Sequence, residues 1–208
     1  QGPVHMKINS FTSFYPERPG LIHIEQDLFG RLSADPAWIA EPKFNGSRLL
    51  LHRLPSGIWQ FWNRHQERFS FVASNELVAA LMALPLEPGK YYLFDGELRH
   101  NKTVGVRQKI VLYDVFIFGD ELLCGVPFED RRGILETLEK NGGGYEALTI
   151  APQYPGDFRR VFDELTPNPE IEGLVMKNLG GKLDLGRKRA ANSGWMMKVR
   201  KANNSYKF

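Results

Sequence analysis

Apolar and polar residues alternate along many short stretches of the chain, and this pattern predicts more strands than helices. These stretches are rich in aromatic and β-branched residues, and Gly, Pro and Asn separate them, which is typical of strands joined by turns. The predicted strands are residues 38–43, 47–54, 58–62, 91–98, 109–118, 147–151, 171–177 and 195–200.

Fewer segments are predicted to be helical. Ser74 or Asn75 can cap one helix, and Pro127 is well placed to begin another that ends before a run of glycines. Because strands and helices do not alternate strictly, the order of elements favours an α+β fold with mainly antiparallel sheets. The predicted helices are residues 23–32, 74–84, 127–141 and 157–165.

Composition limits the class of protein. A chain of 208 residues with 42% apolar and 25% charged residues can form one substantial core or two small lobes around a cleft. Its longest apolar run, residues 77–86, is too short for a membrane span of roughly 18 residues. A single cysteine, Cys124, excludes an internal disulfide and fits a reducing compartment, so we expect a cytoplasmic protein. Residues 1–5 resemble a cloning remnant ahead of Met6.

Positive charge is concentrated at the C-terminal end of the sequence. The last 31 residues contain eight basic residues and one acidic residue, although the net charge of the whole chain is only +3. Such a segment suits polyanions such as nucleic-acid phosphates, and a solvated surface is the alternative.

The stretch Glu41-Pro-Lys-Phe-Asn-Gly-Ser-Arg48 contains a candidate nucleophile. Lys43 lies between two predicted strands, and Asn45-Gly46 is a turn signal, so the pattern predicts a hairpin with the lysine at its mouth. A lysine amine can act as a nucleophile when desolvation or neighbouring positive charge keeps it deprotonated. On this stretch alone, an ordinary surface lysine is the simpler interpretation.

Five further segments follow Lys43 in an order that is more specific than any one of them. Together they resemble the nucleotidyltransferase domain of the covalent nucleotidyltransferase superfamily, which comprises ATP-dependent DNA ligases, RNA ligases and mRNA capping enzymes. The resemblance implies an α+β nucleotidyltransferase (ATP-grasp-like) domain over residues 6–208, with the nucleotide in a cleft. The segments are Asn63-Arg-His65, Phe94-Asp-Gly-Glu-Leu98, Leu112-Tyr-Asp-Val115, Glu172-Gly-Leu-Val-Met-Lys177 and Trp195-Met-Met-Lys-Val-Arg200.

ATP-dependent DNA ligases are the most similar members of that superfamily. Residues 127–135, Pro-Phe-Glu-Asp-Arg-Arg-Gly-Ile-Leu, resemble the "PLxERRxLL" helix of many ligases, and Glu41 and Arg48 are also ligase-like. One position departs from the family motif "KxDG", because Asn45 replaces the aspartate. RNA ligases vary at the same position, so they remain an alternative.

The resemblance implies a catalytic set and two cofactors, ATP and Mg²⁺. Lys43 would attack the α-phosphate of ATP and carry AMP through a phosphorus–nitrogen bond. Lys198 and Arg200, two residues apart on one strand, share a face and would clamp that phosphate. Glu172 would hold the catalytic Mg²⁺, and Glu97 is the second candidate for the metal as well as a ribose contact.

The resemblance also implies how the nucleotide would be bound. Glu41 would help to read the adenine edge, and Tyr113 would stack on the base with Val175 on its other face. Arginine side chains would contact the ribose or the phosphate at a nick. The full implied set is Glu41, Lys43, Arg48, Arg64, Glu97, Tyr113, Val175, Lys177 and Lys198.

Strand geometry sets one condition on this site. Glu172 and Lys177 are five residues apart, so a regular strand would place them on opposite faces. Both can face one site only if the strand begins or bends at Glu172-Gly173.

The partners expected from the resemblance are nicked duplex DNA (or RNA) and no membrane. Family ligases continue into an OB-fold domain, a small barrel that suits nucleic acid. We expect a monomer that lacks this domain, either as a piece of a longer ligase or as a minimal protein, and that uses a separate OB-fold or other nucleic-acid-binding partner. The alternatives are an RNA ligase or capping-type guanylyltransferase, and a non-catalytic domain that only binds nucleic acid.

Overall fold

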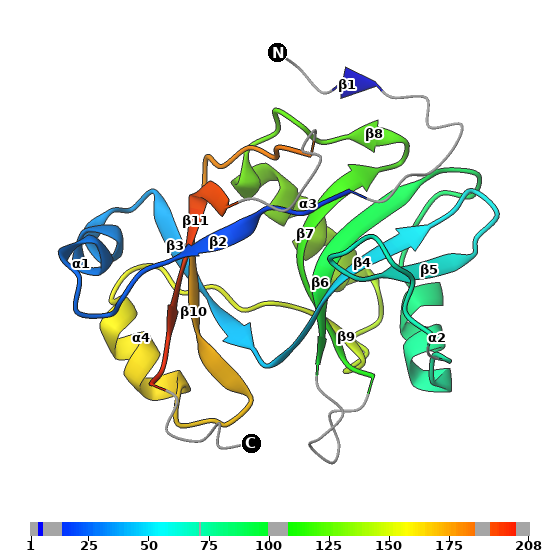
Figure 1. Ribbon diagram of the computed structural model, residues 1–208. Helices are drawn as coiled ribbons and strands as arrows, with labels where there is room; N and C mark the ends of the chain where they lie inside the picture. The colour runs from blue at the N-terminus through cyan, green and yellow to red at the C-terminus, as the bar shows by residue number, and fades with distance from the viewer. Residues whose placement is uncertain (1–3, 6–13, 71, 100–107, 186–191, 203–208) are drawn as a thin grey trace. The chain divides into compact units, whose positions relative to one another are not determined.

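The computed structural model describes residues 4–5, 14–70, 72–99, 108–185 and 192–202 (Figure 1). The chain divides into two compact units, each built around its own sheet. The seven-stranded unit comprises residues 1–17, 46–151 and 180–191, and the four-stranded unit comprises residues 18–45, 152–179 and 192–208.

The seven-stranded sheet is mainly antiparallel, and within the described part of the chain β9 is the one strand that joins it in a parallel pairing, with β7. Its strands, in spatial order, are β1 (Val4–His5), β8 (Glu121–Leu122), β7 (Ile110–Phe118), β6 (Tyr92–Arg99), β4 (Gly46–Arg53) and β5 (Trp59–Trp62), with β9 (Leu148–Ile150) beside β7.

Two helices, α2 (Asn75–Met82) and α3 (Phe128–Asn141), contribute to the main core of this unit. The Ser74 hydroxyl accepts a hydrogen bond from the Leu77 backbone N–H and caps α2, so of the two predicted cap residues, Ser74 and Asn75, it is Ser74 that has this role. Leu49 and Leu51 of β4 belong to this core, whereas Leu50 belongs to a second apolar cluster. The alternation of β4 therefore separates two apolar layers, and Arg48 and His52 lie on the Leu50 face.

The four-stranded sheet has the order β2 (Arg18–Leu21), β11 (Asn192–Arg200), β10 (Ile171–Asn178) and β3 (Trp38–Phe44). Figure 1 shows that α1 (Asp27–Ala34) and α4 (Phe158–Leu165) lie together on one side of it. Apolar residues of both helices form one core with the sheet residues Ala40, Leu174, Met176 and Val199. One face of this sheet is therefore apolar and covered by helices.

The predicted α+β fold with mainly antiparallel sheets is confirmed, and most elements lie where the sequence places them. Helix α1 begins at Asp27 rather than at residue 23, because a turn between His23 and Gln26 precedes it. The short strands β2 and β8 were not predicted, since segments of four and two residues leave little alternation to detect.

The predicted hairpin at Asn45-Gly46 is wrong, because β3 and β4 belong to different sheets. The backbone N–H of Asn45 donates a hydrogen bond to the Glu170 carbonyl, and this contact keeps Asn45 in the four-stranded unit. Gly46 already lies in β4, where a Cβ atom would overlap the carbonyl oxygen of Leu98. The glycine therefore permits a close approach of β4 to β6 and does not form a hairpin turn.

No helix among the described residues is long and apolar enough to cross a membrane. The longest of them, α3, has 14 residues.

His52 is expected to make the protein sensitive to acid. Its side chain is 1% exposed, and burial lowers its pKa to about 3. Below about pH 6.5 the unfolded chain therefore binds a proton that the native protein does not bind until about pH 3, so stability falls as the pH drops through this range. At pH 5 the loss is about 2 kcal/mol.

Urea denaturation of the wild type and of His52→Leu, at pH 7 and at pH 5, measures this effect. The wild type should lose more stability than the variant between the two pH values. His23→Leu, a change at an exposed histidine, should behave as the wild type. Equal losses in the wild type and His52→Leu would contradict the prediction.

Candidate functional site

Charged side chains gather on the face of the four-stranded sheet opposite its helix-covered core. In β3, Ala40 points into the core, so Glu41 and Lys43 point to the other face. The register of β10 places Val175 opposite Glu41 and Gly173 opposite Lys43. Two rows of residues therefore run across this face, one through Glu41 and the other through Lys43.

A β-bulge adds the carboxylate of Glu172 to this face. Ile171 and Gly173 pair with consecutive residues of β3, so Glu172 is an extra residue in β10. Its Oε2 lies 2.5 Å from Nζ of Lys43. The bulge removes the conflict that a regular strand would create between Glu172 and Lys177.

Position 173, beside this bulge, accepts only glycine. A Cβ atom here would overlap the carbonyl oxygen of Val199 and lie 2.9 Å from the Cα of Arg200. The bulge directs the Glu172 side chain toward Lys43, and the absence of a side chain at Gly173 lets the backbone of β10 lie close to the strand that carries Arg200.

Strand β11 extends both rows with cations. Lys198 pairs with Val175, and Arg200 pairs with Gly173, so both lie on the face of Lys43. Burial lowers the pKa of the Lys198 amine, and the positive charges of Arg200 and Lys43 lower it further. The negative charge of Glu172 acts in the opposite direction but does not outweigh these effects. This face is therefore suited to an anionic group such as a phosphate.

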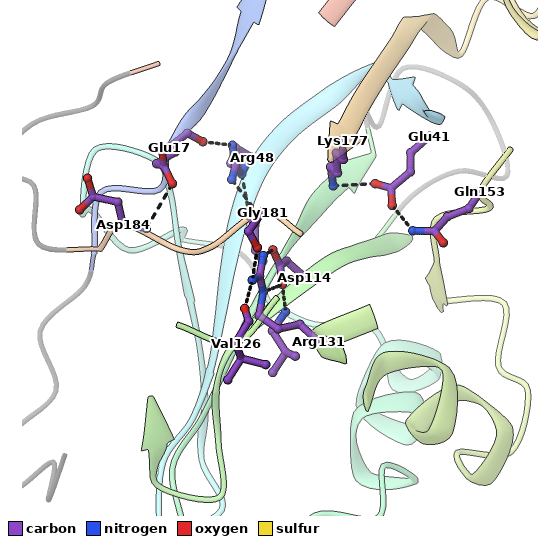
Figure 2. A network of polar contacts seen from close by, with 12 residues as sticks. Glu17, Glu41, Arg48, Asp114, Val126, Arg131, Gln153, Lys177, Gly181 and Asp184 are labelled. Carbon is purple, nitrogen blue, oxygen red and sulfur yellow. Dashed lines mark hydrogen bonds and ion pairs between the residues drawn. The ribbon is translucent and has the colours of Figure 1, made fainter. Parts of the chain in front are cut away.

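Glu41 is the most deeply buried charge of this face. Its side chain is 0% exposed, its Oε1 lies 2.6 Å from Nζ of Lys177, and its Oε2 accepts a hydrogen bond of 2.8 Å from Nε2 of Gln153. Figure 2 shows Glu41 between these two partners. Gln153 was not singled out from the sequence, because it belongs to none of the motifs and reaches Glu41 only through the fold.

The seven-stranded unit contains a second group of predicted residues. Arg48 forms a two-pronged ion pair with Asp95, with Nε–Oδ1 and Nη2–Oδ2 distances of 2.6 and 2.7 Å. It also donates a hydrogen bond of 3.0 Å to the Glu17 carbonyl (Figure 2). Although burial opposes its charge, Asp95 raises the pKa of Arg48. Asp95 was missed as a site residue, although it lies in the quoted segment 94–98.

The other predicted residues of this unit differ in their exposure. Glu97, 8% exposed, pairs with Arg48 across β4 and β6. Tyr113 is half-buried at a second bulge, because Asp95 and Gly96 pair with residues on either side of it. Arg64 is exposed in the loop after β5, where its Nε donates to Nε2 of His65 at 3.3 Å.

The carboxylates of the site are compatible with a Mg²⁺ ion that is held by few protein ligands. Among the described residues, no group of three or more His, Cys, Asp or Glu side chains could form a metal cage. Mg²⁺, however, is commonly held by one or two carboxylates, with water and substrate phosphates completing its shell. Glu172 lies in a bulge on the same sheet face as the cations Lys43, Lys198 and Arg200, and its carboxylate is an oxygen donor of the kind that Mg²⁺ requires.

Comparison with known proteins rests on structure, since no family model and no curated protein matches the sequence. The ligase domain from M. tuberculosis LigD has a TM-score of 0.62 and 18% identity, with 89% of this chain and 59% of that chain covered. A mycobacterial DNA ligase D complexed with ATP and MES has a TM-score of 0.61 and 18% identity, with 89% of this chain and 60% of that chain covered. The ATP-dependent DNA ligase from bacteriophage T7, in complex with ATP, has a TM-score of 0.54 and 14% identity, with 91% of this chain and 69% of that chain covered.

This chain spans about 60% of the length of the two mycobacterial structures. TM-scores of 0.54–0.62 establish the similarity of fold, whereas identities of 14–18% do not establish the activity. The chain therefore has the α+β nucleotidyltransferase fold of ATP-dependent DNA ligase domains.

Proposed function

We propose that this chain is the catalytic domain of an ATP-dependent polynucleotide ligase, with nicked duplex DNA as the favoured substrate. The observation that carries the proposal is the face on which Lys43 contacts Glu172 and is flanked by Lys198 and Arg200. A nucleophile, a metal-binding carboxylate and two phosphate-binding cations are the groups that phosphoryl transfer requires. The similar folds that bind ATP, in the mycobacterial and T7 ligases, support the same proposal.

The first step forms a covalent intermediate on Lys43. The amine, after losing its proton, attacks the α-phosphorus of ATP. A phosphorus–nitrogen bond forms, the bond from that phosphorus to the bridging oxygen breaks, and pyrophosphate leaves. Lys198 and Arg200 stabilise the negative charge that develops on the phosphoryl oxygens.

Two transfers then seal a nick. A 5′-phosphate oxygen of the nicked strand attacks the AMP phosphorus, so the phosphorus–nitrogen bond breaks and the Lys43 amine regains a proton. The neighbouring 3′-hydroxyl then attacks the 5′-phosphorus and loses its proton, and AMP leaves as the phosphodiester forms. Because both steps are in-line displacements at phosphorus, positioning and positive charge matter more than acid–base catalysis.

The remaining residues are proposed to bind the substrate. Glu172 would hold Mg²⁺, which would neutralise charge on the phosphates when bound. Glu97 would bind the ribose or serve as a further metal ligand, and Tyr113 would stack on the base. Arg48 and Arg64 are proposed contacts to ribose or phosphate, and the pairing of Arg48 with Asp95 pre-orients its guanidinium for such a contact.

A second candidate, RNA ligase activity, is favoured by Asn45. An amide cannot supply the negative charge of the family's aspartate, although it keeps much of its shape and hydrogen bonding. We therefore propose that the joining steps, or the choice between DNA and RNA, are the part of the reaction that differs in this chain.

Intact-protein mass spectrometry after incubation with ATP and Mg²⁺ tests the proposal. We expect the mass of one AMP to be added, and to be lost when a nicked duplex with a 5′-phosphate is supplied. Parallel reactions with nicked DNA and nicked RNA identify the joined polynucleotide, and GTP identifies a guanylyltransferase. Absence of any nucleotide adduct, with salt-dependent binding of nucleic acid retained, would instead indicate a non-catalytic binding domain.

A further inference from the structure

Gln153, which is not one of the proposed catalytic residues, lies on the same sheet face as Lys43. The segment that contains Gln153 runs along the free edge of β3, where Tyr154 and Ala40 exchange backbone hydrogen bonds of 2.9 and 3.0 Å. Tyr154 packs against the apolar core, as Ala40 does. Because neighbouring side chains on an extended segment point to opposite faces, Gln153 points to the face of Glu41 and Lys43.

Gln153 therefore begins the row that passes through Glu41 and Val175 and ends at Lys198. Three strand-to-strand intervals separate the ends of this row, which is about 14 Å. The parallel row of Lys43 lies two residues away along β3, about 7 Å. A nucleoside monophosphate can cover these distances, with its phosphate at Lys43 and Lys198 and its base toward Gln153.

Glu41 fixes the orientation of the Gln153 amide. Its carboxylate is fully buried, and its two oxygens are held by Lys177 at 2.6 Å and by Nε2 of Gln153 at 2.8 Å. A carboxylate only accepts hydrogen bonds, so it selects the NH₂ end of the amide and directs the carbonyl oxygen away from itself. The buried carboxylate of Glu41 thus determines which end of the Gln153 amide is the nitrogen and which is the oxygen.

We infer that Gln153 is a specificity-determining residue, which uses this oriented carbonyl oxygen to select a base with an amine at position 6, adenine rather than guanine or hypoxanthine. Adenine carries a donor amine at position 6, whereas guanine and hypoxanthine carry an acceptor oxygen there. Two facing acceptors repel each other and leave both desolvated groups unpaired. In this arrangement Glu41 acts as a positioning residue, through Gln153, rather than as a direct contact to the base.

This inference rests on the proposed function for the location of the phosphate, but its first test requires no catalysis. Equilibrium binding of AMP and of IMP, which differ only in the groups at positions 6 and 1 of the base, is measured by calorimetry for the wild type and for Gln153→Leu. The wild type is expected to prefer AMP by about tenfold or more, and the variant is expected to lose most of that preference. Thermal unfolding of both proteins checks that the variant is folded.

Gln26→Leu is the matched control, because it makes the same chemical change at an exposed residue beside α1, on the helix-covered side of the four-stranded sheet. It should keep the wild-type preference. An unchanged preference in a folded Gln153→Leu, no preference in the wild type, or no binding of either nucleotide to the wild type would each overturn the inference.

Covalent labelling with ATP or ITP separates this inference from the proposed function. If AMP is preferred in binding and that preference is lost in Gln153→Leu, but no adduct forms with either triphosphate, the specificity role stands and the covalent mechanism fails. If adducts form with an ATP-to-ITP ratio that Gln153→Leu does not change, the mechanism stands and the specificity role fails.

Discussion

Lys43→Arg should abolish the covalent AMP adduct, lowering its rate of formation by at least about a thousandfold. A guanidinium keeps the positive charge and can still pair with Glu172, so the charge balance of the face is preserved. It stays protonated, however, and has no lone pair with which to attack phosphorus. Intact mass after incubation with ATP and Mg²⁺, followed by peptide mapping, measures the loss.

The matched control for this variant is Lys90→Arg. Lys90 forms an ion pair of 2.7 Å with Glu87 and is much more exposed than Lys43, so its replacement should leave the adduct at the wild-type level. A wild-type rate of adduct formation in Lys43→Arg, or an adduct mapped to Lys198 or another lysine, would show that the nucleophile is wrongly assigned.

Arg131→Met should destabilise the protein by about 3–5 kcal/mol. Arg131 is fully buried and forms a two-pronged pair with Asp114, with distances of 2.8 and 2.9 Å, and it also donates to the carbonyls of Val126 and Gly181 (Figure 2). Removing the guanidinium leaves a buried carboxylate without its cation, which costs more than the loss of an exposed pair. The midpoint of guanidinium chloride denaturation measures the effect.

Two further variants determine whether the buried charge is the cause. Adding Asp114→Asn to Arg131→Met removes the unpaired charge and should restore part of the stability. Arg160→Met, at an exposed arginine that pairs with Asp157 and Glu164, should change stability by no more than about 0.5 kcal/mol. A loss below about 1 kcal/mol in Arg131→Met would contradict the prediction.

Local pattern was sufficient to locate most elements, because the apolar alternation and the caps are properties of neighbouring residues. The cap at Ser74 and the end of α3 before Gly142 are examples. Partners of strands are not local, and this explains the wrong hairpin at Asn45-Gly46. The same two residues permit either a turn or a passage between sheets, and only the contacts with Glu170 and Leu98 distinguish them.

The candidate site shows the same division. Motif order pointed to Lys43, Glu172, Lys198 and Arg200, and the structure brings all four to one sheet face. Strand alternation set the condition that the strand must begin or bend at Glu172-Gly173 if Glu172 and Lys177 are to share a face, and the bulge at Glu172 meets it. Gln153 could not be found in this way, since its proximity to Glu41 depends on an edge segment 112 residues away in the sequence.

The division of the chain into units has a consequence for protein engineering. The backbone passes from one unit to the other after residues 17, 45, 151, 179 and 191, so each unit is assembled from three separate pieces of sequence. No single cut can therefore release either half as an autonomous fragment, and exchange of one half between homologues requires several simultaneous junctions. Because each unit brings together segments that are distant in sequence, we expect slow, concerted folding rather than independent maturation of each half.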